Sequence, residues 1–174
     1  MQALDFYRAV TMDESNLYTG LLDLLEREGI AYCLVGGQGV NAYVIPLISL
    51  NLGFVIASAD LERALEVLHR EYTITELPNA INIASAGSAV RAQIQADPRY
   101  ADFVTRAQRR DVLGRPTMVA SIEDLLRGKV WAASDAQRRP SKRQKDLADI
   151  SRILETYPHL QNTVPPEILS QLFS

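Results

Sequence analysis

Cysteine and histidine are scarce in this sequence, and their scarcity excludes two kinds of site. Cys33 is the single cysteine among 174 residues, so a disulfide within the chain is impossible. Its apolar neighbours favour a buried, inert thiol in a reducing compartment. The two histidines, His69 and His159, lie far apart, and neither has a second ligand three or four residues away. This spacing argues against a histidine metal site.

Long apolar runs are absent too. No stretch approaches the length that spans a bilayer, and Asp5 and Arg8 interrupt the region where a secretory signal would begin. We therefore expect a cytoplasmic protein with no membrane contact. Hydrophobic residues make up 47% of the chain and charged residues 22%, which is ordinary for a globular protein. These values predict one domain over residues 1–174, with a helical C-terminal part from about residue 121.

Charge is unevenly distributed along the chain. The formal net charge is −3, yet residues 106–145 contain eleven Lys or Arg and four Asp or Glu, a balance of +7. A basic surface there could meet the phosphates of RNA or of a nucleotide. The alternative is a set of solvated, arginine-rich helix faces and turns.

Paired glycines follow an apolar run near residue 36. The expected order is strand, glycine turn, short helix and strand, over residues 31–35, 36–37, 38–44 and 51–57. Glycines directly after a strand let backbone N–H groups approach a ligand, and a helix N-terminus attracts anions. The stretch therefore predicts a phosphate site that involves Gly36, Gly37 and Gln38. Glycine used only to turn the chain is the alternative.

Periodicity predicts the remaining elements. We expect helices over residues 13–28, 60–70 and 141–156, one capped by Ser121 and a last one opened by Pro165-Pro166. We expect strands over residues 72–76, 81–84 and 90–95 and a hairpin over residues 109–119. Residues 1–12 show no clear period and are interpreted as a loosely packed arm. The pattern predicts an α+β fold of α/β character, in which helices flank a mixed sheet and further helices close the chain.

Three ordered segments resemble the nucleotidyltransferase fold of the polymerase beta type. The glycine turn is the first, residues 121–133 resemble the family's Lys-bearing helix, and residues 139–150 resemble its Arg-Pro-x-Lys-Asp-x-x-Asp segment. The similarity covers roughly residues 14–155 and is strongest to the small bacterial AbiEii-like branch, which is associated with toxin–antitoxin and phage-defence loci. This resemblance implies a nucleotide-binding cleft and a cognate toxin or antitoxin protein as a partner.

The acids of that family are missing here. Its Arg-x-Thr-x-Asp-x-Asp pattern supplies two acids that hold divalent metal, and in register Ser49 stands at the Thr position while Asn51 and Gly53 replace the acids. The strand matching the third family carboxylate offers only glutamines. A neutral amide is a poor ligand for a hard cation, and glycine has no side chain to offer. We therefore expect no metal site, with Mg²⁺ or Mn²⁺ bound only if Asp97 or another acid substitutes.

Lys129 lies inside the apolar stripe of its expected helix. A buried ammonium without a partner is costly, so Lys129 must reach water, a carboxylate or a phosphate. On the next helix Asp146 projects at the edge of the inward face, whereas Asp149 lies further round. We therefore expect Lys129 and Asp146 to face the same cleft as Gly36. The alternative is that Lys129 reaches past its neighbours to solvent and that Asp146 pairs with Lys142 one turn earlier.

Three functions remain open on these features. The first is a degenerate nucleotidyltransferase with a nucleotide- or phosphate-binding cleft, whose substrate-binding residues would be Gly36, Gly37, Gln38, Ser49, Lys129 and Asp146. The second is an active transferase that moves a nucleoside monophosphate from its triphosphate to an RNA end or a protein hydroxyl, using displaced acids. The third is a protein-interaction module on the same scaffold. The missing acids favour the first.

Overall fold

The computed structural model describes residues 2–11 and 16–173. Its strands are β1 (Tyr32–Val35), β2 (Asn51–Ile56), β3 (Thr73–Leu77), β4 (Ala80–Ala84), β5 (Arg91–Gln95), β6 (Gln108–Val112) and β7 (Arg115–Val119). Its helices are α1 (Ala3–Thr11), α2 (Leu17–Arg27), α3 (Gly36–Val40), α4 (Leu61–Glu71), α5 (Ile122–Ser134), α6 (Pro140–Thr156) and α7 (Pro166–Leu172). Short 3-10 helices cover Ser58–Asp60, Pro98–Arg106 and Pro158–Thr163.

The strands form one mixed sheet in the order β3-β4-β5-β2-β1-β7-β6. The pairs β2–β5 and β1–β7 are parallel, and the other neighbouring pairs are antiparallel. A mixed sheet flanked by helices, as the sequence predicts, is therefore confirmed.

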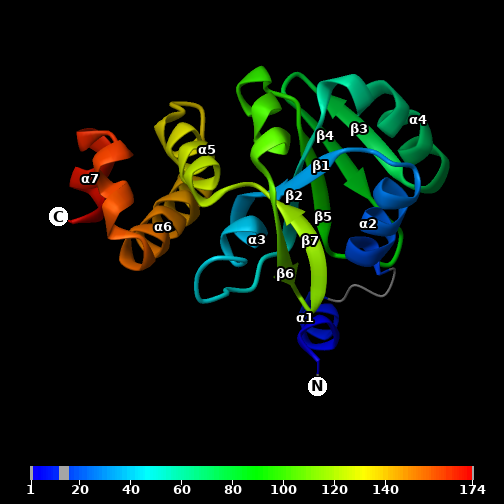
Figure 1. The fold of residues 1–174 in the computed structure, drawn as a ribbon, viewed down its shortest axis with the longest axis horizontal. Helices are drawn as coiled ribbons and strands as arrows, with labels where there is room; N and C mark the ends of the chain where they lie inside the picture. Colours follow the sequence, from blue (N-terminus) through cyan, green and yellow to red (C-terminus); the bar gives the residue numbers. More distant parts are fainter. Residues whose placement is uncertain (1, 12–15, 174) are drawn as a thin grey trace.

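Alternating side chains give the two faces of the sheet different roles. Leu52 and Phe54 of β2 are fully buried, and the Phe54 ring packs edge-on against Tyr32, whose hydroxyl donates to Glu26 of α2 at 3.0 Å. Because successive residues of a strand point to opposite faces, Asn51 and Gly53 lie on the other face. Figure 1 shows α2 and α4 together on one side of the sheet and α5, α6 and α7 grouped on the other.

The N-terminal region differs from the expectation. Residues 3–11 form helix α1 instead of a loose arm, and residues 13–15 of the helix expected over residues 13–28 lie outside the described residues. Tyr7 explains the order, since its side chain is 4% exposed and its hydroxyl donates to the Ser49 carbonyl at 3.1 Å. Leu4 also packs against the core, so a few contacts hold the helix without a long apolar stripe.

The other boundaries shift by a few residues. The short helix after β1 begins at the glycines themselves and ends at Val40, earlier than expected. Ser121 caps α5 as predicted, since its hydroxyl accepts a hydrogen bond from the Asp124 backbone N–H at 3.2 Å. Among the described residues, no helix combines the length and the apolar character needed to cross a membrane.

Candidate phosphate-binding cavity

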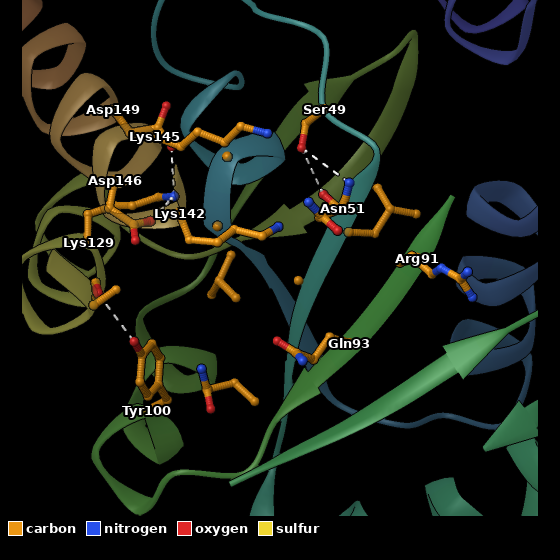
Figure 2. A pocket seen from close by; sticks show the side chains of 18 of the residues that line it. Ser49, Asn51, Arg91, Gln93, Tyr100, Lys129, Lys142, Lys145, Asp146 and Asp149 are labelled. Atoms are coloured by element: carbon orange, nitrogen blue, oxygen red, sulfur yellow. Dashed lines mark hydrogen bonds and ion pairs between the residues drawn. The ribbon is translucent and has the colours of Figure 1, made fainter. Parts of the chain in front are cut away.

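A cavity of about 590 Å³ opens between the sheet and the helices α5 and α6. Its volume is in the range of small-molecule sites. The sheet contributes residues of β2, β3, β4 and β5, the helices contribute Lys129, Lys142, Lys145 and Asp146 among others, and Gly36 and Gly37 border the same space. Segments that are far apart in the sequence thus form opposite walls (Figure 2).

The glycine turn leaves one border of this cavity open. Gly36 has φ +69°, a left-handed conformation that suits glycine. A Cβ at Gly37 would lie 3.5 Å from Asp149 Oδ2 and 3.7 Å from Ser49 Oγ. Ser49 is held by its own turn, because its hydroxyl donates to the Asn51 carbonyl at 3.2 Å and accepts from the Asn51 backbone N–H at 3.3 Å. Backbone and hydroxyl groups therefore border the space here, next to the Asp149 carboxylate.

The sheet wall carries no acid at the two expected positions. Asn51 and Gly53 both line the cavity, as their alternation on β2 predicts. A Cβ at Gly53 would lie 3.2 Å from Val35 Cγ2 on the neighbouring strand, so a larger residue there needs a small shift of Val35. On β5 the facing positions hold Gln93 and Gln95. This wall offers amide oxygens where a divalent cation would need anionic ones.

Lys129 and Asp146 lie in this cavity and pair with each other. The Lys129 Nζ atom is 3.0 Å from Asp146 Oδ1 and 2.7 Å from Asp149 Oδ2, and the three side chains are only 12%, 2% and 11% exposed. Asp146 also binds Arg138 at 2.8 Å, and Asp149 also binds Arg152 at 2.7 Å. Asp149, which the sequence argument placed further round the helix, is thus a full member of the cluster.

Asp124 is the third aspartate that lines the cavity. Its carboxylate is 1% exposed and binds Arg106 at 2.8 Å and Arg127 at 2.6 Å. All three lining aspartates therefore have two basic partners each. Within residues 2–11 and 16–173, no three acidic, histidine or cysteine side chains form a group that could hold a metal ion. The residues of the cavity do not fit the metal-binding role that the nucleotidyltransferase resemblance implies.

Lys142 and Lys145 of α6 line the cavity without a carboxylate partner in the described part of the chain, and Arg91 of β5 is a third such cation. Figure 2 shows the side chains of Lys142 and Lys145 extending from α6 toward Ser49 and Asn51. Burial lowers the pKa of Lys142, and nearby cations, Lys145 first among them, lower it further. Helix α6 also has no acidic residue in its first turn and no side-chain cap. A positive potential therefore faces the cavity from α6.

Two residues named from the sequence lie elsewhere. Gln38 is 3% exposed and does not line the cavity; its side-chain oxygen accepts a hydrogen bond from Asn41 at 3.2 Å. The helix turns this side chain into the interior, so Gln38 could reach a ligand only through its backbone, and its place in a phosphate site stays a prediction. Asp97 caps the 3-10 helix Pro98–Arg106 and binds Arg99 at 2.7 Å, which lowers the pKa of its carboxyl. It does not line the cavity.

Ion pairs and ring contacts neutralise or cover much of the predicted basic region 106–145, so it does not form one continuous basic surface. Arg115 binds Asp23 and Glu26, Arg110 lies over the Tyr43 ring at 3.9 Å, and several others bind the cavity aspartates. The unpaired cations concentrate around the start of α6.

Comparison with known proteins identifies the architecture. No family model matches the sequence, and no curated protein matches it. Solved structures do match. A lincosamide antibiotic adenylyltransferase with lincomycin bound aligns with a TM-score of 0.57 and 14% identity over 82% of this chain and 99% of its own. ANT(2'')-Ia in complex with adenylyl-2''-tobramycin aligns with a TM-score of 0.65 and 11% identity over 89% and 96%. The chain has the nucleotidyltransferase fold.

A nucleotidyltransferase-like protein from Paracoccidioides brasiliensis shares this fold, with a TM-score of 0.54 and 18% identity over 93% of this chain and 88% of its own. At such identities the likeness shows the nucleotidyltransferase fold alone, because one fold supports many chemistries.

Proposed function

We propose that this nucleotidyltransferase-fold protein binds a nucleotide or another phosphate-bearing ligand without a divalent metal and does not transfer nucleotides. Lys142 and Lys145 carry the proposal, because two cations without acidic partners point across a cavity toward Ser49 and the glycine turn. Ammonium groups and backbone N–H groups are common phosphate ligands. An RNA end also carries phosphates, so the proposed site could bind RNA as well as a free nucleotide.

The loss of transfer follows from the chemistry of the reaction. Nucleotidyl transfer depends on neutralising charge at the phosphate, which metal ions bridged by carboxylates accomplish. Asn51 and Gly53 supply no anionic oxygen, and the lining aspartates are already paired with cations. An active transferase would need acids from elsewhere, and Asp97, the candidate in the sequence, lies outside the cavity. The geometry therefore favours a binding protein over an enzyme.

The ligands of the structural neighbours are not assumed to bind to this protein. One neighbour holds lincomycin and another holds adenylyl-2''-tobramycin. An aminoglycoside carries several amino groups, which Lys142 and Lys145 would repel, whereas a phosphate would be attracted. We therefore propose that, of these ligands, only a group like the phosphate-bearing adenylyl group of adenylyl-2''-tobramycin is bound by this protein.

An apolar loop favours a second candidate function, binding to a partner protein. Ile45, Leu47 and Ile48 are 85%, 56% and 58% exposed. Helix α1, which binds the Ser49 carbonyl at the end of this loop through Tyr7, exposes Phe6 by 49%. Exposed apolar clusters often mark interaction sites. The AbiEii-like resemblance implies a cognate toxin or antitoxin as this partner. If such a protein is co-expressed, replacing Ile45 and Ile48 by serine should abolish a complex that survives replacement of Lys142 by alanine.

Calorimetric titration of ATP in EDTA, repeated in Mg²⁺ and in Mn²⁺, tests the phosphate site. Trp131, the single tryptophan, offers a second readout because its ring lies 5.2 Å from Tyr100, which lines the cavity. We expect binding in EDTA and about a tenfold loss of affinity for each of Lys142→Ala and Lys145→Ala, since hydrogen bonds to charged groups contribute about 1.5–3 kcal/mol.

Arg109→Ala is the matched control. Arg109 is exposed on the edge strand β6, outside the cavity, so its removal should leave ATP affinity unchanged. Binding that requires divalent metal, or that survives both lysine substitutions, contradicts the proposal. Transfer of labelled nucleotide to RNA or to the protein itself by the natural chain would favour the active transferase instead.

A further inference from the structure

A second cavity lies between the three C-terminal helices. It has a volume of about 400 Å³, and its lining comes from the end of α5, the first half of α6 and helix α7 with the proline before it. None of its lining residues borders the first cavity. Figure 1 shows these three helices grouped at one end of the molecule. The volume is sufficient for a small ligand that would be separate from the phosphate site.

Arg143 contributes to this cavity a guanidinium group that is only partly hydrogen-bonded. Its Nη2 atom donates to the Asp135 carbonyl at 2.7 Å, whereas its buried Nε atom has no acceptor among the described residues. Nearby, Arg138 and Arg152 each bind an aspartate, at 2.8 Å and 2.7 Å, but no carboxylate in the described part of the chain binds Arg143. A guanidinium group carries five N–H donors. Arg143 therefore has donors left for an anionic group.

Glu167 of α7 lines the same cavity and has no ion-pair partner within residues 2–11 and 16–173. Its backbone oxygen accepts hydrogen bonds from the Ser170 hydroxyl and the Gln171 side-chain amide, both at 2.9 Å, but no side chain in those ranges binds its carboxylate. Glu167 and Arg143 carry opposite charges, yet they do not bind each other. A ligand with both an ammonium group and a carboxylate would neutralise both side chains.

The setting of Arg143 distinguishes this pair from ordinary surface charges. Two fully exposed charges would need no ligand, because water satisfies them. Arg143 is partly buried, and water does not reach its Nε atom. A partly desolvated cation gains more from an anionic ligand than a solvated one does, since charges interact more strongly where water is excluded. Ala133 and Ile168, both buried and apolar, line the same space.

We propose that this cavity binds a small zwitterion, namely an α-amino acid with an apolar side chain. The carboxylate lies at Arg143, because two N–H groups of a guanidinium hold the two oxygens of a carboxylate in parallel. The ammonium group lies at Glu167, and the apolar side chain packs against Ile168 and Ala133. This site does not depend on the phosphate site proposed above.

Calorimetric titrations of leucine and of its two halves, without nucleotide, test this inference. Isocaproate lacks the amino group of leucine, and isopentylamine lacks its carboxylate, so leucine should bind more tightly than either. Arg143→Gln should weaken the binding of leucine and of isocaproate about tenfold, without weakening that of isopentylamine. Glu167→Gln should weaken the binding of leucine and of isopentylamine by a similar factor, without weakening that of isocaproate.

Arg139→Gln is the matched control. It removes an arginine charge one turn before Arg143, at an exposed position outside both cavities, and should leave leucine affinity unchanged. Leucine should also raise the Tm of the natural chain. If Arg143→Gln does not fold, Glu167→Gln decides, because the Glu167 side chain is exposed and makes no contact that folding needs. Absence of leucine binding, binding that survives both substitutions, or isocaproate bound as tightly as leucine overturns the proposal.

Discussion

Replacing Lys142 by glutamine should stabilise the ligand-free protein and weaken its binding of phosphates. Lys142 lies in the first turn of α6, a helix that starts at Pro140 with no side-chain cap and no acidic residue in that turn. Burial lowers the pKa of Lys142, and the charges of Lys145, Arg138 and Arg139 lower it further. The charged form of this side chain is therefore unfavourable in the folded protein.

The size of the effect follows from the position of the charge. An unfavourable charge at a helix terminus costs about 0.3–1 kcal/mol, which corresponds to about 1–4 °C in Tm for a chain of this length. Because the folded-state pKa of Lys142 lies below its ordinary value of 10.5, the unfolded chain binds more protons between the two values. The stability gained by the Lys142→Gln variant is therefore fully present at neutral pH and disappears as the pH rises toward 10.5.

Urea denaturation at low salt, followed by Trp131 fluorescence, measures this difference. Tripolyphosphate should reverse the order of stability, since a ligand at a hundredfold excess over its Kd stabilises by about 2.7 kcal/mol and the variant binds it less tightly. Arg70→Gln is the control: it removes the same charge from the last turn of α4, where a cation is favourable, and should lower stability. A Lys142→Gln variant no more stable than the natural chain at low salt would refute the reasoning.

Two further substitutions address the buried charges and the missing acids. Lys129→Met leaves Asp146 and Asp149 with one cation each, so urea denaturation should show a loss of about 2–3 kcal/mol in the free energy of unfolding, less than the about 3–5 kcal/mol expected when a buried charge keeps no partner. Adding Asp149→Asn should restore part of this lost stability. A Lys129→Met variant as stable as the natural chain would contradict the argument that these charges are buried. Joint replacement of Asn51 and Gly53 by aspartate should create Mn²⁺ binding, detectable by electron paramagnetic resonance, which the natural chain is expected to lack; comparable binding by the natural chain would show that other acids hold the metal.

Sequence periodicity was sufficient for most of the fold. The alternation on β2 placed Asn51 and Gly53 on one face, and both line the cavity. The apolar stripe around Lys129 placed that residue in the same cavity as the glycine turn, with Asp146 as its partner. These predictions succeeded because burial of an apolar face fixes the direction of every other side chain on the element.

The remaining features depend on contacts between distant segments. Helix α1 was missed because it is held by a few contacts to distant segments, among them the hydrogen bond from Tyr7 to the Ser49 carbonyl and the packing of Leu4 against the core. Asp149 was set aside because its position on the helix is further round, yet the long Lys129 side chain reaches it as well as Asp146. The sequence named Lys142 only as an alternative partner of Asp146, since no pattern in the sequence shows which wall of a cavity a helix side chain faces.

The strand order of the sheet also determines when the cavity can form during folding. The parallel pairing of Leu34 with Val119 joins segments from opposite halves of the chain, and contacts that close such long loops form slowly. During synthesis the glycine turn and β2 emerge well before Lys142 and Lys145, so the first wall is made before its counterpart exists. Partly folded or truncated chains should retain secondary structure and yet fail to bind phosphate. Ligand binding would thus report complete folding of this protein.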